Sequence, residues 1–472
     1  MNLTVIGGGP AGLSAAHEAL RLGASTVVIE KEPVVGGLAR TVEHDGHRFD
    51  IGPHRFFTTN DEVRDLFIDV AGEDLLRVPR MTRIRHGERW FDYPLTPVGA
   101  AFGLGPVESA RILSSYAAAR SRRMLKPAEP VTFEDWTVDA FGRRLFETFF
   151  EGYTEKVWGI SCREISADWA AQRIKGLSLV TAVANALGSR AGKVKTLADE
   201  FLYLRRGAGS LYERMSDRIL AGGGEVHLAS TVETIEHDDR SAKAVTWRGG
   251  DGQRETRHVE ALLSSAPLTE LLAMMRPAPP ADVLDACRGL RYRAHLAVNL
   301  IVEGNPFPDN WIYVHSPGVR AARIANYRNF SPEMAAGPHT SPLTVEYFCF
   351  PGDETWRMDD EALLALASRE LVHMGLHGMG PRNITRGFVL RSPQAYPVIE
   401  TGHDARVGRI REWLSRFDNL LPIGRAGMFK YNNQDHAIAT GLLAARTVLG
   451  HGRFDPWQVN IDASYLEAAP AR

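Results

Sequence analysis

Cysteine is scarce in this chain, which has Cys162, Cys287 and Cys349 among its 472 residues. The number is odd, the three positions lie far apart, and none belongs to a C-x-x-C pair. These features exclude a disulfide framework and a cysteine zinc site as organising elements, and we expect no metal. A reducing, cytoplasmic location is the expectation that fits this cysteine usage.

Long apolar runs and an excess of one charge are also lacking. No run approaches the roughly 18 residues of a membrane-spanning helix, and no charged leader precedes the first apolar segment. The formal net charge of −2 gives no general attraction to nucleic acid or to an anionic membrane. We therefore predict a soluble protein with a small-molecule substrate and no nucleic-acid partner, and a membrane partner is disfavoured.

A glycine-rich turn organises the N-terminal part of the chain. The apolar run from Leu3 to Ile6 predicts a buried strand, and residues 7–12, Gly-Gly-Gly-Pro-Ala-Gly, follow it in the pattern G-x-G-x-x-G. A helical pattern comes next. In this setting the first glycine permits a tight turn, the second lets a pyrophosphate approach the backbone, and the third lets the helix pack on the strand. The start of the helix offers free N–H groups to phosphate.

An acidic residue completes the pattern. The β-branched run from Thr26 to Ile29 predicts a second strand, which ends at Glu30, 18 positions beyond Gly12. A carboxylate at this place binds a ribose hydroxyl and would repel a ribose 2′-phosphate, so FAD or NAD is favoured over NADP. The glycines alone would also fit a tight turn without a ligand. Strand, helix and acid together predict dinucleotide binding.

Residues 36–41, Gly-Gly-Leu-Ala-Arg-Thr, resemble the second glycine doublet of the glutathione-reductase-like flavoproteins. That group includes amine oxidases, protoporphyrinogen oxidase, phytoene desaturases and UDP-galactopyranose mutase. The resemblance implies a noncovalently bound FAD, whereas the alternative is a glycine turn with a surface arginine. The resemblance assigns FAD binding to the following residues: Gly7, Gly9, Pro10, Ala11, Gly12, Glu30, Lys31, Gly37, Leu38, Ala39, Arg40, Val232, Gly424, Arg425, Asp435, Ala437 and Ile438.

Further motifs resemble UDP-galactopyranose mutases. They are the turn Gly-Pro-His at residues 52–54, Tyr-Thr-Glu-Lys-Val-Trp-Gly at 153–159, Leu-Arg-Tyr-Arg at 290–293, and Gly-Arg-Ala-Gly-Met-Phe-Lys-Tyr at 424–431. The resemblance implies that an arginine holds a diphosphate, that tyrosines orient it, and that a histidine tunes the flavin. It assigns catalytic roles to His54, Arg293, Tyr396 and Tyr431, and substrate binding to Tyr153, Trp158, Arg293, Tyr396 and Tyr431. The alternative for His54 is a turn histidine that hydrogen-bonds to the backbone. The alternative for the aromatic residues is packing in the core.

The mutase resemblance implies a redox-neutral reaction of a nucleotide-diphosphate sugar. In it, pyranose and furanose forms interconvert through an adduct between the sugar and N5 of reduced FAD. Residues 38–40 and 438–445 are closer to the oxidases. The alternative is therefore an amine oxidase or protoporphyrinogen oxidase type of enzyme, which transfers hydride from substrate to flavin between apolar walls such as Phe56-Phe57 and Phe149-Phe150. A binding protein with FAD as a structural ligand is the third interpretation.

The predicted fold class is α/β, with a Rossmann-like FAD-binding domain of the glutathione reductase 2 type and an inserted substrate domain. We expect residues 1–95, 200–285 and 386–460 to form the discontinuous FAD-binding domain. Residues 96–199 are expected to form a helical cap, and 286–385 a substrate domain with a mixed or antiparallel sheet. The arginine-rich helix expected over 99–125 fits a solvated face or contact with a membrane surface.

Overall fold

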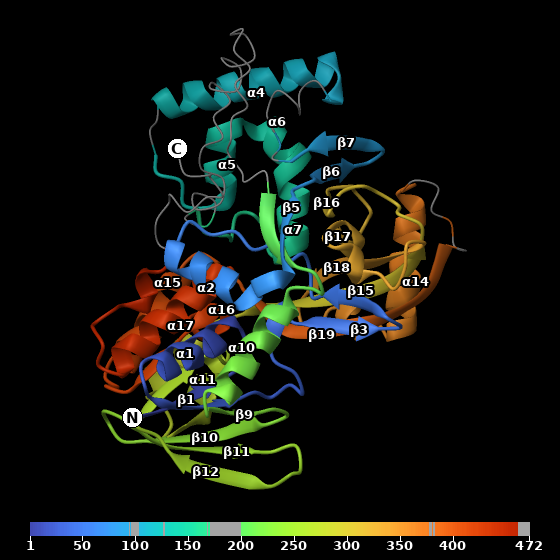
Figure 1. Cartoon of the computed structure of the whole chain (residues 1–472). Helices are drawn as coiled ribbons and strands as arrows, with labels where there is room; N and C mark the ends of the chain where they lie inside the picture. The colour runs from blue at the N-terminus through green and yellow to red at the C-terminus, as the bar shows by residue number, and fades with distance from the viewer. Residues whose placement is uncertain are drawn as a thin grey trace.

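The computed structural model describes residues 1–460 apart from 94, 96–102, 126–127, 168, 170–199, 377–379 and 381–382. The first residues of the helix expected over 99–125, and the cap region expected over 170–199, lie outside this description. Three parts are stacked along the long direction of Figure 1: a small β-sheet with the N-terminus near it, a central layer of helices and strands, and a helical part at the other end.

A five-stranded sheet carries the predicted cofactor turn. Its strand order is β20-β13-β1-β2-β9, and every neighbouring pair is parallel. The strands are β1 (Asn2–Ile6), β2 (Ser25–Ile29), β9 (Glu225–His227), β13 (Ala261–Ser264) and β20 (Leu420–Pro422). Helices α1 (Pro10–Arg21), α10 (Gly209–Ala221) and α17 (Gln434–Val448) pack against one another beside it. The mixed α/β fold expected from the sequence is confirmed, and three distant stretches of chain build this sheet.

A seven-stranded sheet forms the second core. Its order is β19-β15-β18-β17-β16-β6-β7, with β6 and β16 as its parallel pair. The strands are β6 (Thr82–His86), β7 (Arg89–Asp92), β15 (Tyr292–Glu303), β16 (Trp311–Val314), β17 (Arg323–Asn326), β18 (Thr340–Cys349) and β19 (Ile384–Pro397). The expected domain boundaries near 95 and 386 are wrong here. Strands β6, β7 and β19 join this sheet through long-range pairing, which local patterns do not reveal.

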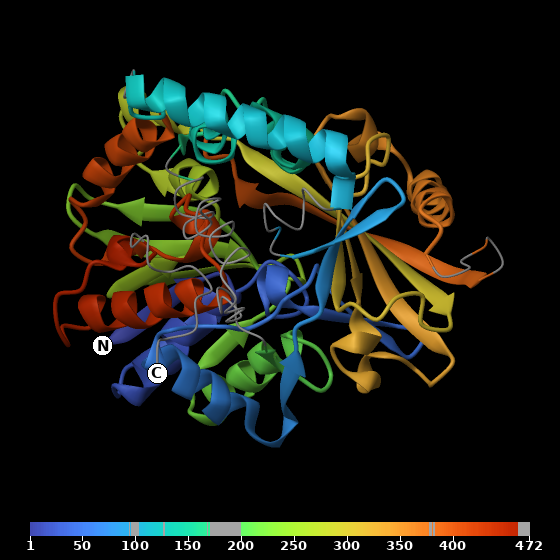
Figure 2. The same ribbon diagram turned by 90° about the horizontal axis from the view of Figure 1, so that it is seen from above.

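The helical part lies over one end of the seven-stranded sheet (Figure 2). It contains α4 (Pro106–Leu125), α5 (Phe133–Phe141), α6 (Arg143–Leu145), the π-helical turn η3 (Phe146–Glu151) and α7 (Gly152–Trp158). Buried aromatic residues hold these helices together. A separate four-stranded sheet is made by β10 (Thr231–His237), β11 (Ala242–Arg248), β12 (Arg254–His258) and β14 (Met275–Arg276).

The remaining elements connect these parts. The strands are β3 (Thr41–His44), β4 (His47–Asp50), β5 (Leu75–Pro79) and β8 (Glu200–Leu204). The helices are α2 (Asp61–Ala71), α11 (Leu268–Met274), α12 (Ala281–Arg288), α13 (Glu354–Arg357), α14 (Asp360–His373), α15 (His403–Leu414) and α16 (Gly424–Gly427). Short helical turns are η1 (Gly37–Ala39), η2 (Gly72–Asp74), η4 (Tyr327–Asn329), η5 (Pro332–Met334) and η7 (Pro456–Gln458).

Candidate active site

The predicted glycine turn connects β1 to α1 and needs its glycines. Gly7 has φ +97°, and a Cβ atom on Gly12 would lie 1.9 Å from the carbonyl oxygen of Gly7. Pro10 opens α1, no side chain caps the helix, and its first turn contains no acid. The start of α1 therefore keeps N–H groups and a partial positive charge available for an anion, which is what a pyrophosphate requires.

The second glycine doublet faces this turn. The backbone N–H of Gly36 donates to the carbonyl of Gly8 at 2.8 Å, and a Cβ atom on Gly37 would lie 3.3 Å from the Cα of Gly9. Arg40 donates from Nη1 to the carbonyl of Gly37 at 2.9 Å. The structure thus brings the two predicted glycine segments into direct contact. Leu38 and Ala39 lie in the same turn, η1, while Lys31 is exposed to solvent.

Glu30 lies beside the strand that carries Val232, a predicted cofactor-binding residue. Its buried carboxylate accepts from the N–H of Gly8 at 2.5 Å and from the N–H of Glu32 at 2.8 Å. The N–H of Ser230 donates to the backbone carbonyl of Glu30 at 2.8 Å, and β10 with Val232 begins directly afterwards. The acid and the valine, about 200 positions apart in sequence, therefore meet at the C-terminal end of β2.

The C-terminal segment closes the same region. A Cβ atom on Gly441 of α17 would lie 2.2 Å from the carbonyl oxygen of Ala11, and Ser14 Oγ donates to the carbonyl of Ile438 at 3.2 Å. Ala437 and Ile438 are buried, and Gly424 has φ +77°. Since these residues fit a flat, anion-bearing dinucleotide between three segments, the geometry suits the predicted FAD.

The turn that carries His54 rests on a buried ion pair. Gly52 has φ +91°, and a Cβ atom there would lie 2.9 Å from Oε2 of Glu346. Burial, followed by the charge of Arg425, lowers the pKa of His54 to about 3, so its imidazole is neutral. Its Nδ1 atom is buried and has no hydrogen-bond partner in the described part of the chain. A polar group on a bound flavin would satisfy this atom.

The ion pair joins Arg323 of β17 to Glu346 of β18. Arg323 donates from Nε and Nη2 to the two carboxylate oxygens at 2.6 and 2.5 Å, and His295 Nε2 lies 2.9 Å from Oε2. Burial alone would raise the pKa of Glu346, but Arg323 and His295 lower it to about 2. The Arg323 side chain is 20% exposed while Glu346 is fully buried, so the cation is the accessible partner.

Arg425 lies beside both predicted site tyrosines. The rings of Tyr396 and Tyr431 stack with centroids 5.6 Å apart, and the guanidinium carbon of Arg425 is 4.8 and 5.3 Å from their centroids. Its Nε donates to the carbonyl of Asn432 at 2.7 Å. Burial and Tyr431 raise the pKa of Tyr396, whereas Arg323 and Arg425 lower it. Two arginines therefore act on one tyrosine, which stays protonated and able to donate.

Arg293 occupies a different kind of position. Its guanidinium donates to the carbonyls of Val157 at 3.0 Å, Lys156 at 3.3 Å and Phe348 at 2.8 Å, and the residue is 5% exposed. Two of these carbonyls belong to the end of α7. The side chain thus caps a helix in the structure, and its predicted contact with a diphosphate stays a prediction.

The remaining predicted substrate residues are separated. Trp158 is buried, with its ring 5.7 Å from that of Tyr431. Tyr153 instead stacks on His315, with centroids 4.1 Å apart and planes 8° apart, and its ring edge meets Tyr313. The two members of one sequence motif therefore contribute to two neighbouring aromatic groups.

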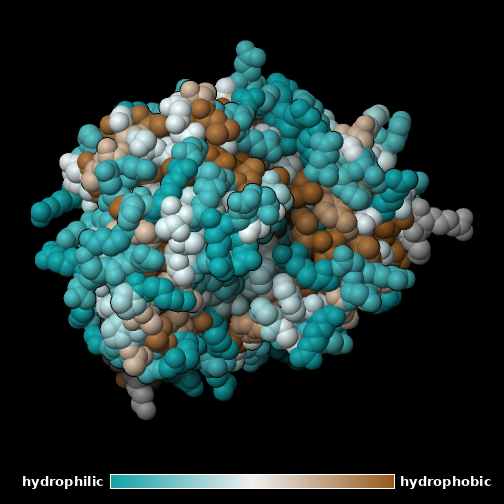
Figure 3. Space-filling model, turned by 90° about the horizontal axis from the view of Figure 1, so that it is seen from below, coloured by the Kyte–Doolittle hydropathy of each residue, from teal (hydrophilic) through white to brown (hydrophobic). Residues whose placement is uncertain are grey.

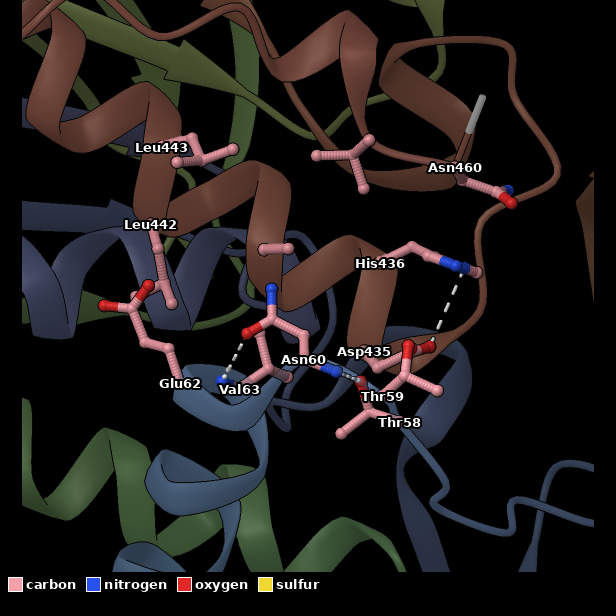
Figure 4. A pocket seen from close by; sticks show the side chains of 12 residues that line it. Thr58, Thr59, Asn60, Glu62, Val63, Asp435, His436, Leu442, Leu443 and Asn460 are labelled. Carbon is pink, nitrogen blue, oxygen red and sulfur yellow. Dashed lines mark hydrogen bonds and ion pairs between the residues drawn. The ribbon is translucent and has the colours of Figure 1, made fainter. Parts of the chain in front are cut away.

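Asp435 lines a pocket of about 250 Å³ between α2 and α17 (Figure 4). Thr58, Asn60, Leu442 and Leu443 also face this pocket. Burial raises the pKa of Asp435 to about 7, while hydrogen bonds from the His436 N–H and the Thr58 side chain lower it. The figure shows Asp435 on the pocket side of α17, so a contact with FAD stays a prediction for this residue.

Sequence reasoning did not single out the ion pair of Arg323 and Glu346 or its neighbour His295. A signal was present, because Glu346 and His295 each interrupt an otherwise apolar strand run. Charged residues are almost never fully buried unless they are paired. A lone acid and a lone histidine in two buried strands could therefore have indicated a shared internal site.

Comparison with known proteins supplies a family. A sequence model described as flavin containing amine oxidoreductase matches residues 10–449. A Klebsiella pneumoniae protein named as a probable UDP-galactopyranose mutase is 27% identical over 173 residues, which is 35% of this chain. The matched stretch covers 43% of that protein, less than half of its length.

Solved structures show the same fold. The crystal structure of reduced UDP-galactopyranose mutase superposes with a TM-score of 0.82 at 21% identity, covering 97% of this chain and 98% of the other. Putrescine oxidase bound to putrescine superposes with a TM-score of 0.64 at 15% identity, covering 95% and 99%. At these identities the likeness concerns the fold.

Proposed function

This chain belongs to the family of flavin-containing amine oxidoreductases and is an FAD-binding flavoenzyme, and on that premise we propose that its substrate is a nucleotide-diphosphate sugar. The proposed reaction is an interconversion of sugar ring forms, like that named for the mutase relatives. It would leave the overall redox state of the substrate unchanged.

One observation carries this proposal: Arg425 and Arg323 both lie near Tyr396 and lower the pKa of its hydroxyl, and the ring of Tyr431 stacks on Tyr396 in the same site. Guanidinium groups form charge-assisted, two-pronged bonds with phosphates. Arg323 is already paired with Glu346, but Arg425 forms no ion pair with a described residue, and its charge would be costly beside an uncharged apolar substrate. Beside a diphosphate that charge is favourable.

Each residue has a definable task. Glu346, itself bonded to His295, holds the Arg323 guanidinium in one orientation, and the Asn432 carbonyl does the same for Arg425. Tyr396 and Tyr431 would donate hydroxyl hydrogen bonds to phosphate oxygens. Bound FAD in its reduced form would supply the electron pair that the sugar carbon requires. The neutral imidazole of His54 would donate or accept one hydrogen bond at the flavin without adding charge.

A screen of nucleotide sugars and amines tests the proposal. The purified enzyme would be incubated with each compound under dithionite without oxygen, and separately in air. We expect nucleotide-sugar turnover in the reduced arm, without peroxide. The Tyr396→Phe variant should raise KM about tenfold and keep its FAD, because one hydrogen bond to a charged group is lost. Peroxide release from an uncharged amine in air would contradict the proposal.

Hydride transfer from an amine is the second candidate, and the family description favours it. The aromatic residues that could wall an apolar substrate site are used elsewhere. Phe56 is buried and stacks on Phe67 at 3.8 Å, and Phe150 stacks on Phe141 at 5.4 Å. Since these rings build the core, they give little support to an apolar substrate site, and the air arm of the screen decides the question.

A further inference from the structure

Among the described elements of the helical part, helix α4 is the outermost. Figure 1 shows it crossing the end of the molecule above α5 and α6, and Figure 2 shows it in front of the elements beneath it. The opposite face of the molecule, in Figure 3, is mostly hydrophilic with separated hydrophobic patches. Residues 106–125 form this helix, and Ile112 is its buried side chain.

The inner side of α4 is firmly attached. Ile112 packs in a core cluster with Phe141 and Phe149. The N–H of Arg144 donates to Ser115 Oγ at 3.0 Å, and Arg144 also pairs with Glu108. A Cβ atom on Gly142 would lie 2.7 Å from a backbone nitrogen of α4. The helix therefore presents a fixed outer face.

That outer face is apolar or small along its whole length. Leu113 is 49% exposed, and Met124 and Leu125 at the end are 84% and 82% exposed. The exposed residues of this face, which recur at helical spacing, are Val107, Ala110, Leu113, Ser114, Ala117, Ala118, Ser121, Met124 and Leu125. A solvated helix normally places charged residues on such a face. Here none of the residues on it is charged.

Arginine residues border this face on both sides. Arg120 lies at one edge, and Arg111 and Arg122 lie at the other, according to their helical positions. Arg120, Arg122 and Arg123 form no ion pair with any described residue. The acid of the helix, Glu108, pairs with Arg144 beneath the helix and with Arg111 at the border, so Arg111 is compensated and Arg120, Arg122 and Arg123 are not. The surface therefore combines exposed apolar groups with uncompensated positive charge.

We infer that the outer face of α4 lies on an anionic lipid surface, in the plane of the membrane. Apolar residues between arginines match the boundary between acyl chains and negative headgroups. A second copy of this chain fits less well, because two such helices would bring arginines together with no acid on either face. In the described part of the chain, no helix has the length and apolar character to span a bilayer, so the contact is peripheral.

Vesicle sedimentation with the FAD-loaded enzyme tests this inference. The enzyme should pellet with vesicles of mixed phosphatidylglycerol and phosphatidylcholine, and stay in solution with phosphatidylcholine alone. High salt should weaken binding, because it screens charge. The triple variant Arg120→Glu, Arg122→Glu, Arg123→Glu should bind roughly a hundredfold more weakly, about fivefold for each arginine lost.

A matched control changes the same charge elsewhere. Arg206, Arg416 and Arg453 are exposed on other parts of the molecule, and their triple replacement by Glu should leave vesicle binding within about twofold of the parent. A second variant, Met124→Ser with Leu125→Ser, touches only exposed groups and should also weaken binding.

Three outcomes would overturn the inference. The first is equal binding by the α4 variant and the parent enzyme. The second is equal binding to neutral and anionic vesicles. The third is a parent enzyme that is dimeric in sedimentation equilibrium and a Met124→Ser, Leu125→Ser variant that is monomeric, which would assign the face to a second copy.

Discussion

At the scale of single residues, Arg293 has two competing roles that one variant separates. Arg293→Lys keeps the charge but replaces the planar guanidinium by a single nitrogen, which does not match the spacing of the carbonyls on α7 and β18, so we expect a loss of about 1–3 kcal/mol in the free energy of unfolding. Nucleotide-sugar Kd should change less than about threefold. Thermal melts and calorimetric titration measure the two effects.

Arg291→Lys is the matched control, because Arg291 is two positions away and 46% exposed. It should change neither quantity measurably. A tenfold weaker Kd in Arg293→Lys with an unchanged melting temperature would instead support direct contact with the diphosphate.

Asp50 should make stability depend on pH. Burial raises the pKa of Asp50 to about 7, although Thr41, Tyr203 and the N–H of Ala208 lower it. A carboxyl whose pKa is higher in the folded chain than its unfolded value of 3.8 stabilises the folded state fully at pH below 3.8. This contribution is lost as the pH rises from 3.8 through about 7. We therefore expect the melting temperature to fall between about pH 4 and pH 7 and to level off above pH 7. Melts of Asp50→Asn should show a smaller fall, and an unchanged slope would contradict the assignment.

At the scale of elements, the contact between α1 and α17 depends on Gly441. Gly441→Ala would place a Cβ atom 2.2 Å from the Ala11 carbonyl and 2.4 Å from Ser14 Oγ. We expect a loss of about 2 kcal/mol or more in the free energy of unfolding, together with lower FAD content. Denaturant unfolding and the flavin absorbance of purified protein measure this.

Gly408→Ala provides the control for Gly441→Ala. Gly408 lies on the exposed face of helix α15, with nothing within 4 Å of its Cβ position. Its replacement should stabilise the protein by about 0.5–1 kcal/mol, because alanine favours a helix over glycine. Similar losses in both variants would show that helix propensity, rather than close approach, governs Gly441.

Substitution of two glycines of positive φ tests whether the turn that carries His54 contacts the flavin. Gly52→Ala strains the backbone and also meets the Glu346 carboxylate at 2.9 Å, whereas Gly87→Ala strains the backbone with nothing within 4 Å. Both should lose about 1–2 kcal/mol from the left-handed conformation. We expect only Gly52→Ala to change the flavin absorbance spectrum as well. Equal spectra for the two variants would argue against contact between this turn and the flavin.

Local patterns in the sequence predicted the elements whose contacts are close in the chain. The strand, glycine turn and helix at residues 2–21 are set by neighbouring residues, and the structure has them. The pairing of β6 with β16 joins residues more than 200 positions apart, and no local pattern specifies that register. For the same reason the pair of Arg323 and Glu346 became visible only in the folded chain, since it requires β17 to lie beside β18.

At the scale of the whole molecule, FAD should protect distant segments together. Residues 7–12, 36–41 and 424–441 meet beside one sheet, so we expect FAD to slow amide hydrogen exchange in all three at once. Exchange measured by mass spectrometry with and without FAD checks this. Strands β11 and β12 of the four-stranded sheet serve as an internal reference, because FAD should change their amide exchange little. Protection confined to residues 7–12 would contradict a shared site.

The pairing of β20 with β13 has a consequence for synthesis. The five parallel strands come from residues 2–29, 225–264 and 420–422, so the sheet lacks an edge strand until most of the chain exists. Folding units form as their residues leave the ribosome, N-terminal part first. The nucleotide-binding turn emerges early and must wait for the last tenth of the chain before its surroundings are complete. Fragments that stop before residue 420 should therefore leave the ribosome unable to retain the flavin.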